Sequence, residues 1–208
     1  MKKYIDISWP VSEAITTYKD KKDVRITKVK NFDLNKVNES KLEIGSHTGT
    51  HIDAPLHFIK NGQTIDELDL RKVNGKCKVL DFTSVTDKIT TLDLQSKKIK
   101  KGDIILLKTT NSYLASEGSF EPNFVYLDKH ASEYLIKIGV KAVGIDYLGI
   151  ERSQLEHETH VTLFNAGIWI IEGLRLKEAK ENQNYYLNCM PILVKNMEAA
   201  PARAILFY

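Results

Sequence analysis

The chain has 208 residues, about the size of one ordinary domain, so we expect a single domain over residues 1–208. Lys and Arg number 30 against 27 Asp and Glu, which gives a formal charge of only +3. This balance offers no strong field for nucleic acid, and a small-molecule or protein partner is expected instead. No stretch approaches the roughly 20 apolar residues that a membrane-spanning helix requires, so no membrane partner is expected.

The first residues and the cysteines bear on location. Two lysines are followed by Asp6 and Pro10 before any apolar run can form, which is unlike a secretory signal and favours a cytoplasmic protein. Cys77 and Cys189 lie far apart and have no CxxC context. We therefore expect no disulfide framework and no thiolate zinc site, and each cysteine is expected to be a small buried side chain.

The apolar pattern predicts strands with at least two helices between them. Half-buried strands are expected over residues 1–10 and 24–33, separated by a charged surface loop over 19–23. Short apolar runs predict buried strands over 76–83 and 103–109. Farther along, the pattern predicts a helix over 128–138 that Gly139 ends, a strand over 140–146, a helix over 159–166, and strands over 168–174, 185–194 and 202–208. This order predicts a mixed α/β domain with a substantial sheet or barrel.

Histidines gather in the segment SHTGTHIDAPLHF, residues 46–58. An even spread of the six histidines would place about 0.3 of one in an eleven-residue window, whereas His47, His51 and His57 all lie here. The β-branched residues around Gly49 predict an extended segment over 46–53. Side chains of a strand alternate, so His47, His51 and Asp53 are expected on one face, with Gly49 leaving space between the two imidazoles.

Imidazole and carboxylate donors together suit a borderline transition metal such as Zn²⁺ or Mn²⁺. The alternative for His47 and His51 is an ordinary hydrogen-bonded place in a sheet. His57 follows Pro55 and is expected in a turn. It would either complete the metal shell or act as an acid and base beside it, because its ordinary pKa lies near neutrality.

A second polar group occurs in EHETH, residues 156–160. Its histidines are three residues apart, unlike those of the zincin HExxH motif, and on a short helix His157 and His160 would share a face. A solvated helix cap is an equally good interpretation of His157. Glu172 ends the apolar run IWII, where a carboxylate should be paired, protonated or bound to a metal.

The segment HTGTHIDAPLHF matches the pattern HxGTHxDxPxH at every specified position. On this motif, and on supporting matches at residues 6–8, 102–109, 139–146, 160–174 and 200–205, the sequence resembles the cyclase family of metal-dependent hydrolases along its whole length. The family includes bacterial kynurenine formamidases, enzymes of tryptophan catabolism, and isatin hydrolases. The resemblance implies a swivelling β/β/α-type fold with a mixed, barrel-like sheet, and a homodimer or higher homo-oligomer.

The resemblance also implies the site residues. His47, His51 and Asp53 would bind one divalent ion, Zn²⁺ or Mn²⁺, and Asp53 would bridge toward a second where two are present. His160 would serve that second ion, Glu172 would bridge or complete the site, and His57 would donate and accept protons. The implied reaction is cleavage of a C–N bond of a small formamide or cyclic amide by metal-activated water, most concretely N-formylkynurenine to kynurenine and formate.

Two departures from the family concern the substrate. Tyr18 stands where the formamidases place a tryptophan, and residues 147–151 read YLGIE where many relatives carry a serine-containing DxxSxD segment. We expect Tyr18, Phe58 and Trp9 to line an aromatic pocket, with ordinary packing as the alternative for each. Other candidate functions are an isatin-type lactam hydrolase and a metal-dependent ligand-binding protein that has lost turnover.

Overall fold

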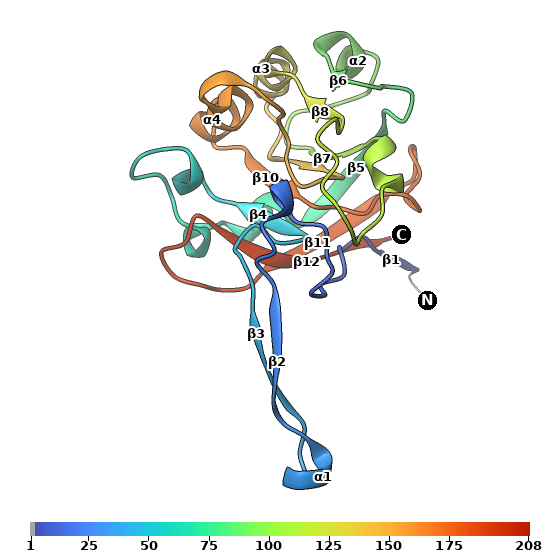
Figure 1. Cartoon of the computed structure of the whole chain (residues 1–208). Helices are drawn as coiled ribbons and strands as arrows, with labels where there is room; N and C mark the ends of the chain where they lie inside the picture. Colours follow the sequence, from blue (N-terminus) through green and yellow to red (C-terminus); the bar gives the residue numbers. More distant parts are fainter. Residues whose placement is uncertain (1–2) are drawn as a thin grey trace.

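The computed structural model describes residues 3–208 (Figure 1). Seven strands close into a barrel in the order β12-β11-β5-β7-β9-β10-β4, with β4 returning to β12, and β1 extends the sheet beside β12. The strands of this sheet are β1 (Tyr4–Asp6), β4 (His51–Asp53), β5 (Gly75–Asp81), β7 (Ile104–Lys108), β9 (Ala142–Ile145), β10 (Trp169–Glu172), β11 (Tyr185–Pro191) and β12 (Ala199–Phe207). The mixed, barrel-like sheet of an α/β fold is therefore confirmed.

The four parallel strands, β5, β7, β9 and β10, are covered on both faces. In β7, Ile104 and Leu106 belong to the cluster inside the barrel, whereas Ile105 and Leu107 belong to the cluster under the helices. Because successive side chains of a strand point to opposite faces, a strand covered on both sides is apolar throughout. This explains the continuous apolar runs in the sequence.

Three helices lie together over one side of the barrel (Figure 1). They are α2 (Thr91–Gln95), α3 (Lys129–Ile138) and α4 (Glu158–Asn165). The last two confirm the predicted helices to within one residue, and α3 ends at Gly139, whose φ of 85° is the left-handed conformation that glycine adopts without strain. In residues 3–208, no helix combines the length and the apolar character needed to cross a membrane.

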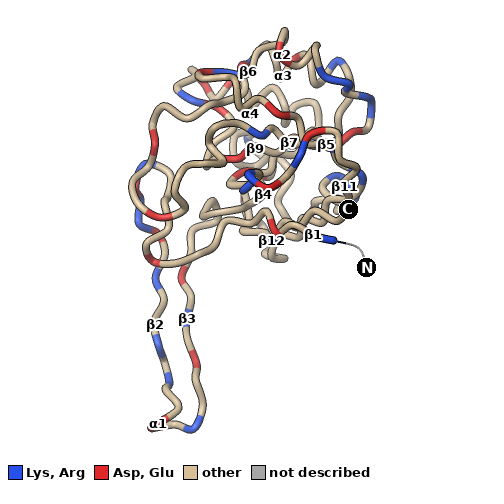
Figure 2. Tube along the Cα trace, turned by 90° about the vertical axis from the view of Figure 1, so that its right-hand side faces the viewer, with Lys and Arg blue, Asp and Glu red and all other residues tan. Residues whose placement is uncertain are grey.

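A hairpin of β2 (Arg25–Lys30) and β3 (Glu39–Glu43) projects away from the barrel, with the short helix α1 (Phe32–Asn35) at its tip (Figure 1). The charged residues of β2 are all basic, whereas β3 carries two glutamates and one lysine (Figure 2). Every residue of β2 is exposed, so the prediction of a half-buried strand over 24–33 was wrong. An alternating pattern specifies a strand but does not specify which element, if any, covers it.

The first predicted strand is also shorter than expected, because only Tyr4–Asp6 pair with β12. Residues 1–2 of that prediction lie outside the described residues.

The remaining short elements are β6 (Lys88–Ile89), β8 (Tyr126–Leu127) and the 3₁₀ turns η1 (Tyr18–Asp20), η2 (Pro55–His57), η3 (Ile65–Glu67), η4 (Leu70–Lys72), η5 (Thr110–Tyr113) and η6 (Leu155–His157). Of these, η2 and η6 border the candidate site.

Candidate metal centre

The candidate site lies on the outer face of the barrel wall, where β4 and β10 pair antiparallel. Ile52 and Ile171 are directly opposite each other and belong to the cluster inside the barrel. Since side chains alternate along a strand, His51, Asp53 and Glu172 point to the other face, toward α4. The pairing of the strands thus brings together residues from two distant parts of the sequence.

Helix α4 adds His160 to this face, and four buried side chains meet. The Nε2 atom of His51 lies 3.3 Å from Oδ1 of Asp53 and 3.4 Å from Oε2 of Glu172. The Nε2 atom of His160 lies 3.2 Å from Oε1 of Glu172 and 3.6 Å from Oδ2 of Asp53. Each carboxylate therefore presents one oxygen to each imidazole.

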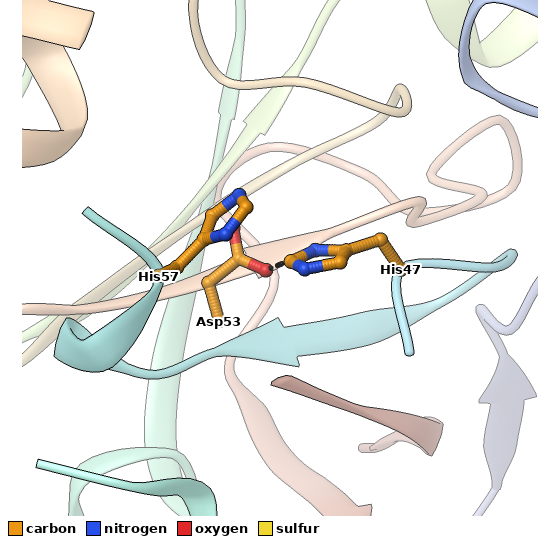
Figure 3. Close-up of side chains that lie close together, drawn as sticks. All are labelled: His47, Asp53 and His57. Carbon is orange, nitrogen blue, oxygen red and sulfur yellow. Dashed lines mark ion pairs between the residues drawn. The ribbon is translucent and has the colours of Figure 1, made fainter. Parts of the chain in front are cut away.

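His47 reaches the carboxylate of Asp53 from a turn and not from the predicted strand. Residues 46–50 form turns and bends, and β4 begins only at His51, so the prediction of one extended segment over 46–53 was wrong. The Nδ1 atom of His47 nevertheless lies 2.9 Å from Oδ1 of Asp53 (Figure 3). A turn, and not the strand geometry expected for His47, therefore brings this side chain to Asp53.

Gly49 also has a different role from the expected one. Its φ is +62°, and its carbonyl oxygen lies against Gly173, whose φ is +66°. A Cβ atom on Gly173 would be 2.0 Å from that oxygen. Gly49 therefore permits a left-handed turn and a close approach of two backbone segments, and it does not serve chiefly as a vacancy between imidazoles.

A backbone hydrogen bond fixes the ring of His51. Its Nδ1–H donates to the carbonyl oxygen of Gly49 at 2.9 Å, because a carbonyl can only accept. In the neutral ring that would bind a metal, Nε2 carries the lone pair and faces the two carboxylates, the arrangement typical of a metal-ligating histidine. Burial opposes a charge on His51, but Asp53 and Glu172 outweigh it and raise its pKa to about 10.

The two carboxylates require a positive partner. Burial opposes ionisation of both, yet the surrounding imidazoles hold the pKa of Asp53 well below its usual range and lower the pKa of Glu172 to about 2. Within residues 3–208, Nε2 of His51 and both carboxylate oxygens of Asp53 are buried without an aligned hydrogen bond. Buried donors of this kind, nitrogen and oxygen around one point, fit a divalent transition metal.

His57 lies in the η2 turn, as expected, with its ring centroid 4.1 Å from that of His47 (Figure 3). Burial lowers the pKa of His57 to about 4, so its imidazole is neutral at pH 7 and can accept a proton. A ring nitrogen of His57 also lies within 4.8 Å of ligand atoms of His47 and Asp53. The geometry is compatible with both roles considered from the sequence, acid and base or metal ligand.

Two acidic residues were missed by the sequence analysis. Oε1 of Glu198 lies 3.5 Å from Nε2 of His47 and accepts a hydrogen bond from Ser46 at 2.6 Å. Glu151 lies 3.1 Å from Nδ1 of His160, and it is only 6% exposed. The signal for Glu151 was its place in the unusual YLGIE segment, whereas Glu198 lies in a loop before β12 that has no distinguishing pattern.

The three aromatic candidates occupy different places. Phe58 stacks on His157, with ring centroids 4.2 Å apart, and so borders the site. Tyr18 lines a cavity of about 260 Å³ that Glu151 and His157 also line. Trp9 is 2% exposed and belongs to a buried core cluster with Tyr147, which corresponds to the ordinary packing considered as its alternative.

His157 confirms part of its alternative interpretation. It is the N-cap residue of α4 with a side chain 57% exposed, but its ring makes no capping hydrogen bond.

A larger open groove, of about 1220 Å³, lies between β5, β11 and residues 96–103. It contains none of the site residues, so volume alone does not locate the chemistry.

Comparison with known proteins defines the class. A solved structure of a potential metal-dependent hydrolase with cyclase activity is 40% identical, covers 100% of this chain and 98% of that chain, and has a TM-score of 0.89. With the buried His, Asp and Glu cluster, this likeness makes the protein a metal-dependent hydrolase of the amidohydrolase type. Residues 5–152 match the family model described as putative cyclase, and the chain belongs to that cyclase family.

The chain is also similar to proteins whose names give an activity. The kynurenine formamidase of Bacillus cytotoxicus is 30% identical over 98% of this chain and 96% of its own length. Isatin hydrolase A from Labrenzia aggregata, solved with benzyl benzoate bound, is 18% identical, covers 99% of this chain and 93% of that chain, and has a TM-score of 0.86. This last likeness concerns the fold. The expected resemblance to the cyclase family is confirmed.

Proposed function

We propose that the protein hydrolyses the C–N bond of a small formamide or cyclic amide, with N-formylkynurenine as the most specific candidate substrate. The observation that carries the proposal is the convergence of buried imidazoles on Asp53 and Glu172, two carboxylates that need a cation. The similarity to a kynurenine formamidase over nearly the whole chain supports the choice of substrate.

We propose that His47, His51 and Asp53 hold one divalent ion, Zn²⁺ or Mn²⁺, and that His160 serves a second. Oδ1 of Asp53 faces His47 and His51 while Oδ2 faces His160, which supports a bridging role. The carboxylate of Glu172 is divided between His51 and His160 in the same way. When bound, such an ion lowers the pKa of water toward neutrality and polarises the substrate carbonyl.

The side chains of the protein would perform the remaining steps. His57, neutral at pH 7, would take a proton from the attacking water as the new C–O bond forms, and would pass that proton to the departing nitrogen as the C–N bond breaks. Phe58 and Tyr18 would pack against the leaving group. Burial, followed by the charges of Glu172 and Glu151, raises the pKa of Tyr18, which keeps its hydroxyl group protonated and able to donate.

The test is a metal-removal and reconstitution assay. Protein treated with a chelator should lose turnover of N-formylkynurenine and regain it with Zn²⁺ or Mn²⁺, while anomalous scattering at the metal edges counts the ions. Isatin and simple formamides in the same assay define the substrate class. Purified protein that takes up neither ion, or hydrolyses none of these amides in a metal-dependent way, contradicts the proposal.

The altered YLGIE segment favours a second candidate, a metal-dependent binding protein without turnover. Tight metal binding with no hydrolysis of any amide, lactam or lactone would support this candidate over the first.

Three further expectations stay predictions: a single domain over residues 1–208, a homodimer or higher homo-oligomer, and a cytoplasmic location. Light scattering coupled to gel filtration tests the oligomeric state.

A further inference from the structure

We propose that Glu151 is the positioning residue of His160, holding the imidazole so that Nε2 faces Asp53 and Glu172. The inference rests on the proposed function, because it takes His160 as a metal ligand. It adds a role for a residue that lies outside the pattern HxGTHxDxPxH. Three groups of contacts carry it: those of the ring, those of the carboxylate, and those of the segment to which Glu151 belongs.

The ring of His160 lies between two carboxylates. Nε2 is 3.2 Å from Oε1 of Glu172, and Nδ1, on the other side of the ring, is 3.1 Å from Oε1 of Glu151. Within residues 3–208, Nδ1 makes no aligned hydrogen bond, so this ion-pair contact is the one that orients it. A metal-ligating histidine normally presents its other ring N–H to a carboxylate or a carbonyl. His51 is held in the corresponding way by the carbonyl of Gly49.

The carboxylate of Glu151 is itself held firmly by the start of α4. Its Oε2 atom accepts the backbone N–H groups of Thr159 at 3.0 Å and of His160 at 3.2 Å, and its Oε1 atom accepts Nδ1–H of His157 at 2.6 Å. The positive end of a helix favours an anion at this place. Burial opposes ionisation, but the contacts with His160 and His157 hold the pKa of Glu151 below its usual value. The loop residue Glu151 is therefore fixed to the first turn of α4, the turn that carries the ring it orients.

The segment that carries Glu151 also holds the opposite ligand. The backbone N–H of Ile150 donates to Oε1 of Glu172 at 2.6 Å. Two consecutive residues, Ile150 and Glu151, thus contact Glu172 and His160, the two groups that face each other in this half of the site. The YLGIE segment is a support for the ligands as well as a wall of the pocket.

His157 links this support to the aromatic wall. Glu156 and His157 have φ values of 54°, a left-handed conformation that costs non-glycine residues strain. This backbone places the His157 ring on Phe58 and its Nδ1–H on Glu151. Strain of this kind persists where the surrounding contacts compensate for it, which agrees with a positional role for the Glu151 carboxylate.

The same three side chains, Glu151, His157 and His160, also have ligand atoms within 4.8 Å of one another and could be imagined to hold an ion themselves. His160 already presents Nε2 to Asp53 and Glu172. Its Nδ1 would have to lose its proton as well to bind a second cation, and a neutral imidazole has only one free lone pair. The positioning role requires no such loss.

The experiment compares Glu151→Gln with Glu158→Gln, a matched control in the first turn of α4 whose carboxylate pairs with Lys129 at 2.8 Å. Metal-free proteins are titrated with Co²⁺, and the visible absorption of the bound ion reports affinity and coordination. The amide of glutamine has one acceptor atom, so it cannot serve both the helix N–H groups and the imidazoles. We expect Co²⁺ affinity to fall about 10–100-fold in Glu151→Gln with an altered spectrum.

Glu158→Gln should bind as the wild type does, and Glu151→Asp, which keeps the charge, should recover part of the affinity. A folded Glu151→Gln protein with wild-type affinity and spectrum overturns the inference alone. Loss of one ion per chain in both Glu151→Gln and His157→Gln, with the others retained, would assign an ion to the three side chains and also overturn it. Wild-type protein that binds no Co²⁺ overturns the proposed function and, with it, this inference.

Should Glu151→Gln fail to fold, ¹⁵N NMR of the Zn²⁺-loaded wild type and of Glu151→Asp provides the second test: the Nδ1–H signal of His160 should move when the carboxylate is withdrawn, and an unmoved signal overturns the inference. The inference requires His160 to carry its proton on Nδ1, next to Glu151, with Nε2 free of a proton. A spectrum that places the proton on Nε2 contradicts it, whatever the behaviour of the variant.

Discussion

His51 and Glu172 are Cα partners across the β4–β10 ladder, and their side chains meet at 3.4 Å. β4 is also the strand that closes the barrel, because it pairs with β12 through Pro201 and His51. The candidate metal centre therefore forms only when the barrel closes. Changes that disturb this closure should remove metal binding, while changes at the edge of the site should affect the chemistry and leave the ion in place.

His57→Gln tests the chemistry at that edge. If His57 transfers protons, kcat should fall about 10²–10⁴-fold, since this is the usual contribution of a positioned acid or base. KM and the metal content, measured by plasma mass spectrometry, should stay close to those of the wild type. A protein that loses an ion together with its activity would instead make His57 a ligand.

Gly173→Ala tests the closure of the barrel. The new Cβ atom would lie 2.0 Å from the Gly49 carbonyl oxygen, in a backbone with a φ of +66°. Strain of about 1–2 kcal/mol and overpacking of about 1–3 kcal/mol should together lower the free energy of unfolding by about 2–5 kcal/mol. Co²⁺ affinity should fall as well, because the Gly49 carbonyl orients His51. Urea denaturation and Co²⁺ titration measure the two effects.

Gly167→Ala is the matched control for this change. Gly167 has a φ of +69°, and a Cβ atom there would meet nothing within 4 Å. Only the strain of about 1–2 kcal/mol should appear, with Co²⁺ affinity unchanged. Equal losses of stability in the two variants would show that close approach to Gly49 is unimportant.

Asp146→Asn should destabilise the fold without entering the metal centre. The buried carboxylate accepts hydrogen bonds from the backbone N–H and hydroxyl groups of both Thr109 and Ser112. An amide has one acceptor atom, so at least one buried donor loses its partner, at a cost of about 1–3 kcal/mol in the free energy of unfolding. Asp33→Asn, on the exposed tip helix α1, should change it by less than about 0.5 kcal/mol. Urea denaturation of both variants at pH 7 provides the comparison.

The two thiols should be inert in the native protein. Cys77 and Cys189 are buried and free, and burial raises the pKa of each to about 12 from an ordinary 9.0. A thiol reagent at pH 8 should therefore label both only after denaturation. Because the folded state keeps protons that the unfolded state loses, the two thiols should reduce stability as pH rises from about 9 toward 12. Rapid labelling of native protein at pH 8 would be inconsistent with this burial.

The sequence predicted most of the side chains that the structure brings together, but the predicted geometry was correct for only some of them. His51 and Asp53 follow from strand alternation, since they do lie two residues apart on one face of β4. His47 was found through the motif, while the turn that brings it to Asp53 depends on the packing of Gly49 against Gly173. Such contacts between distant backbone segments leave no periodic signal in the sequence.

Glu151 and Glu198 illustrate what local patterns omit. Each reaches its histidine from a loop that tertiary contacts place, so neither helix nor strand spacing indicates it. The fold was more accessible, because parallel strands buried on both faces and helices that end at glycine have strong local signals. The exposed hairpin was predicted as a strand, but its lack of cover depends on what the rest of the chain leaves unpacked.

The hairpin has a practical consequence for engineering. Arg25 and Glu43 are Cα partners at its base, so the two strands leave the barrel only about 5 Å apart. A tight two-residue turn could span that gap in place of the whole hairpin, or a foreign peptide could replace the tip, without displacing the strand that carries His51. The hairpin is thus the segment at which this hydrolase can be shortened or tagged while its barrel stays intact.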